Sequence, residues 1–437
     1  MNALRYRLAL LLYTLIVCML LPCAPFYLLW RSRRQPEYRR HWGERFGFGW
    51  IAPFDAAAAD VTAPSIWIHA VSVGETRAAQ PLIAALQQRY PHCRLLLTHM
   101  TPTGRATSHE LYGDSVQRVY LPYDTPWAVR HFLNSYRPQL GLIMETELWP
   151  NLIVACHSLS IPLLLLNARL SARSAARYAR FPALIAPTLA RLRVVAAQSA
   201  DDAHRFVELG ATQVQVSGNM KFDIAAPAAQ EQLAAKFCRH FGPRPVWLAA
   251  STREGEEALI LEAWRKVGAG GTALLAIVPR HPQRFDEVAE LIAASGLKMQ
   301  RRSENREIAP ETQVVLGDSM GEMFAWYAAV DLAFIGGSLL DYGSQNLIEA
   351  CAVGTPVLIG PSTRNFAEAA RAALACHAAR SIQDADELVA AVAELLADAE
   401  QRRRMGEAGR QFAARHRGAT ARTLAIIEAL GARGKAV

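Results

Sequence analysis

The sequence predicts an α/β protein in which two similar domains follow a membrane-anchoring helix. Residues 8–30 contain no charged side chain, and short apolar runs separated by helical segments fill most of the remaining chain. Buried strands that alternate with helices are typical of parallel sheets. About 370 residues follow the anchor, which is enough for two compact domains.

The apolar run at 8–30 is long enough to cross a hydrocarbon core of about 30 Å at a rise of ~1.5 Å per residue. Pro22 and Pro25 interrupt the run, which favours a kinked helix and leaves a shallower insertion open. A cleaved signal peptide is the alternative, because Arg5 and Arg7 precede the run. The run exceeds a usual signal core and lacks a small-residue cleavage site, so we expect a retained anchor.

Charge is concentrated beside this anchor. Residues 1–45 hold eight arginines and two glutamates, and therefore +6 of the formal net charge of +8. The nearly neutral remainder argues against nucleic-acid binding, whereas the basic segment favours contact with anionic lipids. Because most of these arginines lie between Arg31 and Arg45, the positive-inside rule predicts an inner (cytoplasmic) membrane protein with its body on the cytoplasmic side.

The seven cysteines show no C-x-x-C pair, and the twelve histidines show no H-E-x-x-H spacing. These patterns predict scattered reduced thiols and no metal site. A loosely held magnesium ion would leave no such mark in the sequence.

An otherwise helical stretch that is punctuated by Pro and Gly divides the body. We expect the anchor and its basic segment at 1–45, a first domain at 46–225, a connection at 226–245, and a second domain with C-terminal helices at 246–437. The predicted strands are 65–73, 94–100, 116–124, 140–146, 162–169, 193–199, 214–220, 246–252, 273–281, 312–318, 330–338 and 355–360. The predicted C-terminal helices are 384–417 and 419–430, and we expect them to pack at the domain boundary or back on the first domain.

Polar turns follow several strands, and ligands bind at the carboxyl ends of strands in open α/β sheets. Glu75 follows Gly74 at the start of a helix; it is a candidate general base, or an ordinary acidic residue favoured by the helix dipole. Glu145 and Glu147 follow another strand, where a carboxyl group in a closed cleft has a raised pKa or binds a developing cation. Solvated turn acids are the alternative. Lys221 could face an anion, although an exposed loop lysine is the commoner outcome.

In the second domain, Arg280 follows Pro279 at a strand end, where a guanidinium suits phosphate and a surface turn is the alternative. The most specific segment is 333–361. Its glycines allow close approach of a ligand, and the helix predicted from Asn346 offers N–H groups to a phosphate. Glu349 could accept hydrogen bonds from a ribose, and a purely structural glycine turn is the alternative. The glycines and the hydroxyl that we single out in this segment are Gly336, Gly337, Gly343 and Ser338.

Several motifs, taken in order, resemble the 3-deoxy-D-manno-octulosonic acid (Kdo) transferases of lipopolysaccharide core biosynthesis. These motifs are HAVSVGETRAAQPLI, LTHMTPTGR, YLPYDTPWAVRHFL, METELWPNLI, LNARLSARS, SGNMKFD, VPRHPQRF, GDSMGEM and GGSLLDYGSQNLIEA, and the resemblance extends from the anchor to about Phe366. It implies a GT-B glycosyltransferase, with two Rossmann-like domains facing a cleft. It also implies a CMP-Kdo donor, a lipid A precursor (lipid IVA) as acceptor, inversion at the sugar, and no cofactor.

The resemblance further implies that Glu75 is the general base and that Glu145 and Lys221 stabilise the transition state. Gly337 and Ser338 are candidate donor contacts. Many members of the family have GGxNPLE where this chain has GSQNLIE at 343–349, with the asparagine and the glutamate in register. The implied CMP-binding residues are Pro279, Arg280, Met320, Gly321, Glu322, Asn346, Leu347, Ile348 and Glu349.

Two alternative functions remain open from the sequence. One is another GT-B nucleotide-sugar enzyme, such as a UDP-sugar transferase or an epimerase. The other is a membrane-tethered nucleotide-binding module without turnover.

Overall fold

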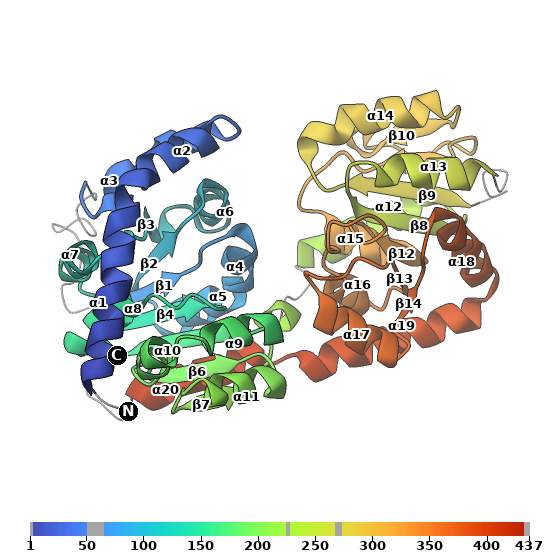
Figure 1. The fold of residues 1–437 in the computed structure, drawn as a ribbon. Helices are drawn as coiled ribbons and strands as arrows, with labels where there is room; N and C mark the ends of the chain where they lie inside the picture. Colours follow the sequence, from blue (N-terminus) through green and yellow to red (C-terminus); the bar gives the residue numbers. More distant parts are fainter. Residues whose placement is uncertain (1–2, 50–64, 224–227, 267–272, 432–437) are drawn as a thin grey trace. The chain divides into compact units, whose positions relative to one another are not determined.

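The computed structural model describes residues 3–49, 65–223, 228–266 and 273–431, and it contains two compact units (Figure 1). Parts of the predicted anchor, connection and domains, namely 1–2, 50–64, 224–227, 267–272 and 432–437, lie outside the described residues. The first unit comprises Met1–Asp223 and Arg417–Val437, and the second comprises Ile224–His416. Each unit contains one parallel seven-stranded sheet, which confirms the predicted α/β class.

The sheet of the first unit has the strand order β3-β2-β1-β4-β5-β6-β7. Every neighbouring pair is parallel, so the carboxyl ends of all seven strands lie at one edge. All seven were expected from the sequence. The strands are β1 (Ser65–His69), β2 (Arg94–His99), β3 (Gln117–Tyr120), β4 (Leu140–Met144), β5 (Leu163–Ala168), β6 (Val194–Ala197) and β7 (Val214–Val216).

Helices cover both faces of this sheet, and successive residues of each strand point to opposite faces. Trp67 therefore packs in one core with Phe132, whereas Ile66 packs in another with Leu82. The helices and short 3₁₀ turns that follow the first strand are α4 (Val73–Ala78), α5 (Gln80–Arg89), α6 (Pro102–Tyr112), η3 (Gly113–Ser115), α7 (Pro126–Tyr136), α8 (Pro150–Ser158), α9 (Ala172–Tyr178), α10 (Pro182–Leu189), α11 (Ala200–Glu208) and η4 (Met220–Asp223).

The last helix, α20 (Ala419–Gly431), belongs to the first unit and not to the predicted second domain. Ala419 and Ile427 are buried in the core formed around Ile66. The carboxylate of Asp223 accepts hydrogen bonds from Gly418 N, at 2.6 Å, and from Thr420 N. The predicted range 246–437 thus assigned this helix to the wrong domain, whereas its expected packing back on the first domain agrees with the structure, because the helix completes an apolar face of the first sheet.

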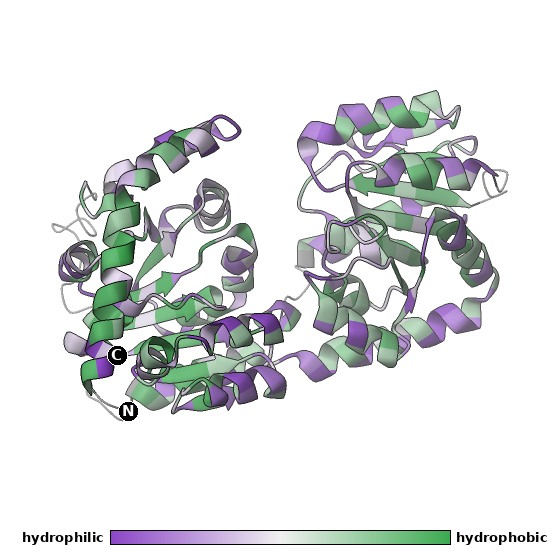
Figure 2. Ribbon diagram, in the orientation of Figure 1, coloured by the Kyte–Doolittle hydropathy of each residue, from purple (hydrophilic) through white to green (hydrophobic). Residues whose placement is uncertain are grey.

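The N-terminal segment forms two helices, α1 (Ala3–Leu20) and α2 (Ala24–Ser32), joined by the 3₁₀ turn η1 (Leu21–Cys23). Pro22 lies in that turn, as the predicted interruption requires. Ala3–Ser32 is the one segment within the described ranges that is long and apolar enough to cross a membrane. Figure 2 shows its hydrophobic colouring along α1.

One side of α1 is docked on the first unit, where it contacts α8 and α10. Tyr13 donates to the Asp124 carboxylate at 2.9 Å, and Thr14 donates to the side-chain oxygen of Asn151 at 3.0 Å. Tyr6 is buried beneath the guanidinium of Arg191, which lies 4.3 Å from its ring centroid. The opposite side is apolar and exposed through Leu4, Leu8, Leu11, Leu12, Leu15, Ile16, Met19 and Leu20.

The basic segment after α2 is folded rather than a uniform charged surface. It contains η2 (Pro36–Arg39) and α3 (Trp42–Phe46). Arg45 is 2 % exposed, and its guanidinium lies 3.7 Å from the ring centroid of Tyr120. Glu44 is also buried and accepts from Arg105 Nη1 at 2.6 Å. Arg45 therefore stabilises this unit and is not available to lipid headgroups.

The sheet of the second unit has the order β10-β11-β9-β8-β12-β13-β14 and is also parallel. Its two edge strands were not predicted, because each has three residues and no apolar run. The strands are β8 (Val246–Thr252), β9 (Leu274–Pro279), β10 (Met299–Arg301), β11 (Val314–Leu316), β12 (Leu332–Ile335), β13 (Val357–Ile359) and β14 (Ala379–Ser381).

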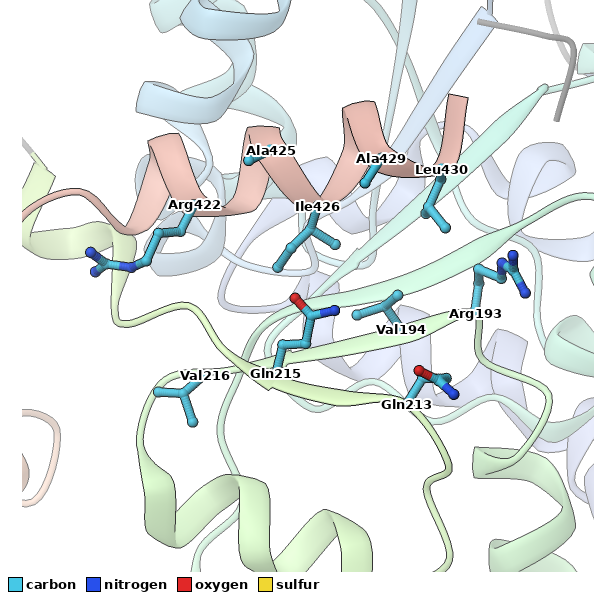
Figure 3. A pocket seen from close by; sticks show the side chains of 10 residues that line it. All are labelled: Arg193, Val194, Gln213, Gln215, Val216, Arg422, Ala425, Ile426, Ala429 and Leu430. Atoms are coloured by element: carbon cyan, nitrogen blue, oxygen red, sulfur yellow. The ribbon is translucent and has the colours of Figure 1, made fainter. Parts of the chain in front are cut away.

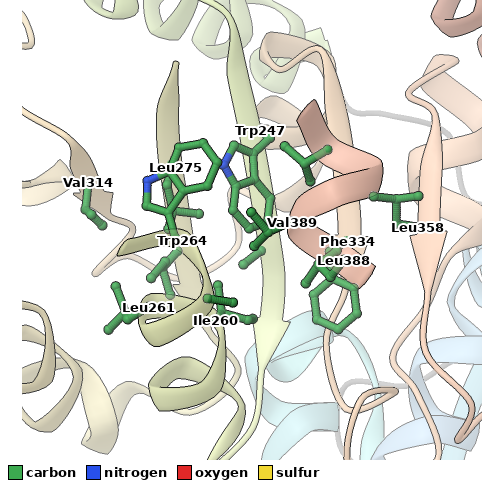
Figure 4. Packing of buried hydrophobic residues seen from close by; sticks show 14 of the residues in the cluster. Trp247, Ile260, Leu261, Trp264, Leu275, Val314, Phe334, Leu358, Leu388 and Val389 are labelled. Carbon is green, nitrogen blue, oxygen red and sulfur yellow. The ribbon is translucent and has the colours of Figure 1, made fainter. Parts of the chain in front are cut away.

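One face of this sheet buries a large apolar core that includes Trp247, Trp264 and Leu388 (Figure 4). The two indole rings are 5.3 Å apart. The helices and 3₁₀ turns of the unit are α12 (Ala228–Phe241), α13 (Glu256–Lys266), η5 (Pro282–Arg284), α14 (Phe285–Ala294), η6 (Arg302–Glu304), α15 (Met323–Ala329), α16 (Ile348–Val353), α17 (Ala367–Ala375), α18 (Ala385–Ala397) and α19 (Ala399–His416).

Two sequence predictions for this unit were wrong. The helical stretch expected as the connection at 226–245 is α12, which belongs to the second unit. It packs on α15 through Phe237 and Trp326, whose ring centroids are 4.6 Å apart. The expected single helix at 384–417 is divided into α18 and α19 at Asp398, whose carboxylate accepts from Gln401 N at 2.8 Å and so begins a new helix.

Candidate active site

Glu75 lies at the carboxyl edge of the first sheet, in the first turn of α4 after β1. Its side chain folds back over the preceding loop, where Val71 N donates to Oε2 at 2.7 Å and Ser72 Oγ donates to Oε1 at 3.0 Å. The residue is 9 % exposed. It is therefore a largely buried carboxyl group that hydrogen bonds hold at the start of the helix.

This environment changes the acidity of Glu75. Burial raises its pKa from 4.5 to about 8, against the opposing effect of the Val71 hydrogen bond, and the charges of Glu145 and Glu147 raise it further. Glu75 follows β1, whereas Glu145 and Glu147 follow β4, and these two strands are neighbours in the sheet. The three carboxyl groups therefore lie near the same edge. A carboxyl group with a pKa near neutrality is suited to accept a proton in catalysis.

Glu145 and Lys221 form an ion pair, with 3.2 Å between Lys221 Nζ and Glu145 Oε1. Both side chains are partly exposed. Lys221 belongs to η4, so the chain after β7 returns across the carboxyl edge of the sheet to the end of β4. The structure thus brings Glu75, Glu145 and Lys221 to one edge of one unit.

The backbone around this ion pair is unusual. Glu145 has a φ of +59° and Asn167, at the end of β5, has a φ of +51°; both values are uncommon for residues with a β-carbon. Asn167 is buried, and its side-chain oxygen accepts from Met220 N at 3.1 Å, beside Lys221. Contacts with the end of β5 thus hold both Glu145 and the segment that carries Lys221. No sequence pattern predicts these contacts.

Glu147 lies near the same edge. Its carboxylate accepts from the indole of Trp149 at 3.0 Å, and burial raises its pKa. It was expected beside Glu145, and the structure places it there.

In the second unit, the glycine turn after β12 is organised by a buried carboxylate that sequence reasoning missed. Glu256 accepts hydrogen bonds from Gly337 N at 2.6 Å, Arg253 N at 2.8 Å and Leu339 N at 3.0 Å. Its side chain is fully buried. An acidic residue in the first turn of a helix is usually exposed to solvent, so nothing in the sequence singled out Glu256.

Arg280 follows β9, as predicted, and its Nε donates to Gln345 Oε1 at 3.2 Å. Gly337 has a φ of +68°, and a β-carbon at this position would lie 3.1 Å from Gln345 Nε2. The loop after β9 and the glycine turn after β12 therefore meet at Gln345, which brings together two of the predicted donor-binding segments.

The turn at 320–322 is held by side chains from other elements. Glu322 forms an ion pair with Arg302, 2.9 Å apart, and also accepts from Ser319 Oγ. Gln230 of α12 donates to Gly321 O at 2.9 Å and accepts from Ala325 N at 3.2 Å. Met320 is exposed at the tip of the turn.

Asn346 and Glu349 are hydrogen-bonded to each other, with 3.0 Å between Asn346 Nδ2 and Glu349 Oε1. Asn346 Oδ1 also accepts from Ile348 N at 3.0 Å, so the helix begins at Ile348, later than expected. The side chains of Leu347 and Ile348 are buried, which leaves only their backbone for a ligand.

The side chain of Ser338, a predicted contact of the sugar donor, lies in the core of the unit. It is fully buried, its hydroxyl donates to Ile335 O, and it accepts from Gly360 N at 2.8 Å. Its side chain therefore packs between the ends of β12 and β13.

A cavity of about 420 Å³ lies elsewhere, between α20 and the strands β6 and β7 (Figure 3). Its lining contains none of the predicted site residues. It includes Arg193, Gln215, Arg422 and Ile426. In the described parts of the chain, no group of three or more His, Cys, Asp or Glu residues is arranged to hold a metal ion.

Comparison with known proteins identifies the family. Residues 40–224 match the family model described as 3-deoxy-D-manno-octulosonic-acid transferase (kdotransferase), and residues 283–412 match that of glycosyl transferases group 1. The chain is 44 % identical over 418 residues to the 3-deoxy-D-manno-octulosonic acid transferase of Bordetella pertussis, covering 93 % of this chain and 96 % of that protein. The chain belongs to the Kdo transferase family.

A second Kdo transferase, from Haemophilus influenzae, is 39 % identical over 421 residues, covering 94 % of this chain and 96 % of the relative. The solved structure of a glycosyltransferase from Rickettsia africae ESF-5 has a TM-score of 0.56 at 13 % identity, over 84 % of this chain and 98 % of that one. The resemblance stated from the sequence is thus confirmed. The chain is therefore a glycosyltransferase of lipopolysaccharide biosynthesis, with two Rossmann-like units of the GT-B class.

Proposed function

We propose that this Kdo transferase moves Kdo from CMP-Kdo to a lipid A precursor, lipid IVA, with inversion at the transferred sugar. The observation that carries the proposal is the buried carboxyl group of Glu75, whose pKa is raised to about 8 at the carboxyl edge of a parallel sheet. Membership of the family supports Kdo as the transferred sugar. The carboxyl group of Glu75 can act as the base that a single displacement needs.

In the proposed reaction, a hydroxyl oxygen of the acceptor attacks C2 of Kdo and transfers its proton to the Glu75 carboxylate. The new bond joins C2 to the acceptor oxygen, and the bond between C2 and the phosphate oxygen breaks. CMP leaves with the electron pair of that bond. A single displacement of this kind inverts the configuration at C2, and a base placed at the attacking oxygen lowers its barrier.

Glu145 and Lys221 act together in this proposal. The transition state carries positive charge on the sugar ring and growing negative charge on the leaving phosphate. A carboxylate and an ammonium group 3.2 Å apart present both complementary charges, and their backbone is fixed before substrate binds. Preorganised charges of this kind stabilise a transition state more than a mobile pair would.

The second unit supplies the CMP site in this proposal. Arg280 is the phosphate ligand, because a guanidinium binds phosphate through paired donors, and Gln345 orients it. Met320, Gly321 and Glu322 form a second contact, and Asn346 and Glu349 a third. Pro279, Leu347 and Ile348 contribute through backbone atoms or by packing, and the buried Ser338 is omitted.

The membrane holds the enzyme near its lipid acceptor in this proposal, with the catalytic body on the cytoplasmic side of the inner membrane. The exposed apolar side of α1, from Leu4 to Leu20, is the surface that inserts. The exposed arginines Arg31, Arg33, Arg34, Arg39 and Arg40 are available for lipid phosphates.

The test is release of CMP from CMP-Kdo by the purified enzyme with and without lipid A precursor. The proposal predicts CMP release that requires the lipid. Binding of CMP-Kdo without release would indicate a nucleotide-binding module, and consumption of a UDP-sugar instead would indicate a different GT-B enzyme.

A further inference from the structure

Arg253 follows β8 at the carboxyl edge of the second sheet and was not selected from the sequence. Its Nη1 lies 2.9 Å from Nε2 of His281, which follows β9. Because a guanidinium can only donate, Nε2 must accept, and the imidazole is therefore neutral with its proton on Nδ1. The pair offers a charged fork of N–H groups and one additional imidazole N–H.

The surroundings of this pair are strongly positive. Burial lowers the pKa of His281, and the charges of Arg253, Arg280 and Arg284 lower it further. Arg284 is neutralised by Glu257, at 2.8 Å, and by Glu287, at 2.9 Å. Across the described ranges, no ion pair of Arg253 is found, so its charge is left to a ligand.

Local geometry holds the Arg253 side chain in place. Its guanidinium lies 4.7 Å from the ring centroid of Tyr342, and Glu256 accepts its backbone N–H. Ser251, two residues earlier, has a φ of +55°, a strained conformation that persists only where the surrounding structure enforces it. The loop that carries Arg253 is therefore held in a defined conformation.

Arg253 adjoins the glycine turn of the proposed donor site. A β-carbon at Gly337 would lie 3.3 Å from Arg253 Cγ and 3.1 Å from Gln345 Nε2, and Gln345 in turn accepts from Arg280. Arg253 thus packs directly against Gly337, and Arg280 reaches the same turn through Gln345. A donor made of a nucleoside monophosphate and a sugar acid carries two anions, a phosphate and a carboxylate.

We propose that Arg253, oriented by His281, binds the carboxylate of the transferred sugar acid, while Arg280 binds the phosphate. This assignment rests on the proposed function, because it requires an acidic sugar in the donor. The planar fork of arginine matches a carboxylate through two parallel hydrogen bonds. Arg253 then selects an acidic sugar nucleotide against neutral ones, and His281 is a positioning residue.

The experiment compares CMP-Kdo, which carries both anions, with CMP, which lacks the carboxylate. With the full-length enzyme and lipid acceptor, initial rates give KM for CMP-Kdo and the inhibition constant of CMP. We expect Arg253→Ala to raise KM by about tenfold or more, the effect of losing a charged hydrogen bond, and to change the CMP inhibition constant less than about twofold. Arg253→Lys, which keeps the charge without the fork, should recover part of the loss.

His281 has a separate readout. His281→Gln retains a side-chain oxygen that can accept from Arg253, so its KM for CMP-Kdo should remain closer to wild type than that of His281→Leu. Arg403→Ala is the matched control, since it removes a positive charge from an exposed pair with Glu400 in the same unit. This control should change neither constant.

Three results would overturn the assignment. An equal rise in KM and in the CMP inhibition constant would show that Arg253 binds phosphate. Unchanged constants in folded Arg253→Ala would show that it is only structural, and Arg253→Gln, which can still lie over Tyr342, serves if the alanine variant does not fold. Failure of the wild-type enzyme to use CMP-Kdo at all would refute the proposed function itself and is seen before any variant is made.

Discussion

Replacing Glu75 with Gln removes the proposed base while keeping the size of the side chain. We expect kcat for Kdo transfer to fall by about 10²- to 10⁴-fold, the usual contribution of a positioned general base. KM for CMP-Kdo should change little, because Glu75 belongs to the first unit and the proposed nucleotide contacts to the second. In wild type, kcat should rise with pH and level above about 8, as the Glu75 carboxyl group ionises.

The same pKa predicts a stability effect with a definite sign. The folded-state pKa of about 8 lies above the ordinary 4.5, so folded protein retains a proton between these values that unfolded protein has lost. Stability contributed by this proton is present below about pH 4.5 and is lost as pH rises to about 8. Each pKa unit corresponds to ~1.4 kcal/mol of unfolding free energy, and the weaker hydrogen bond from Val71 to a Gln side chain costs about 1 kcal/mol. The free energy of unfolding of Glu75→Gln should therefore exceed that of wild type by about 3 to 4 kcal/mol near pH 8.

The assay follows transfer to detergent-dispersed lipid acceptor from pH 6 to 9, together with urea unfolding at each pH. Glu147→Gln is the matched control, because it removes a neighbouring carboxyl group whose pKa is also raised by burial, and it should retain activity within about tenfold. Activity of folded Glu75→Gln within tenfold of wild type would refute the role of Glu75. A free-energy difference that does not vary with pH would refute the raised pKa.

Three further predictions concern the supporting contacts. Lys221→Ala should lower kcat by about 10- to 100-fold yet change the free energy of unfolding by less than about 1 kcal/mol, since the pair with Glu145 is partly exposed; a loss of stability without a loss of rate would contradict this role. Glu256→Ala should lower the free energy of unfolding in urea by about 3 kcal/mol or more, because it leaves buried N–H groups of Gly337 and Leu339 without an acceptor. A urea midpoint equal to that of wild type would exclude this role. Tyr13→Phe should cost about 1 to 2 kcal/mol in detergent by removing the bond to Asp124, whereas Tyr27→Phe on the exposed side of α2 should not; equal effects would show that α1 is not docked through Tyr13.

Much of the fold and part of the site could be predicted because both depend on local patterns. The runs ending at Met144 and Pro279 indicated buried strands, and the polar residues after them were found at the carboxyl edges of their sheets. The same rule would have identified Arg253, which directly follows the run VWLAAST. The edge strands β10 and β14 escaped, since three residues cannot establish a pattern.

The remaining features depend on contacts that are distant in sequence. Glu256 is buried only because three loop amides converge on it, and the positive φ of Glu145 follows from its place beside β5. In α1, Tyr13 and Thr14 form the polar contacts that dock the helix on the first unit. Two adjacent residues with hydroxyl groups in an apolar run indicate a polar contact, but neither residue is charged, and they were not selected from the sequence.

In the proposed function, Glu75 is the general base for transfer of Kdo to the lipid acceptor. The most direct measurement is the mass spectrum of lipid A precursor after incubation with CMP-Kdo and either wild-type enzyme or Glu75→Gln. We expect product heavier by one or more Kdo residues with wild type and essentially unmodified lipid with the variant. Unmodified lipid with wild type, or equal product from both enzymes, would contradict the proposed function.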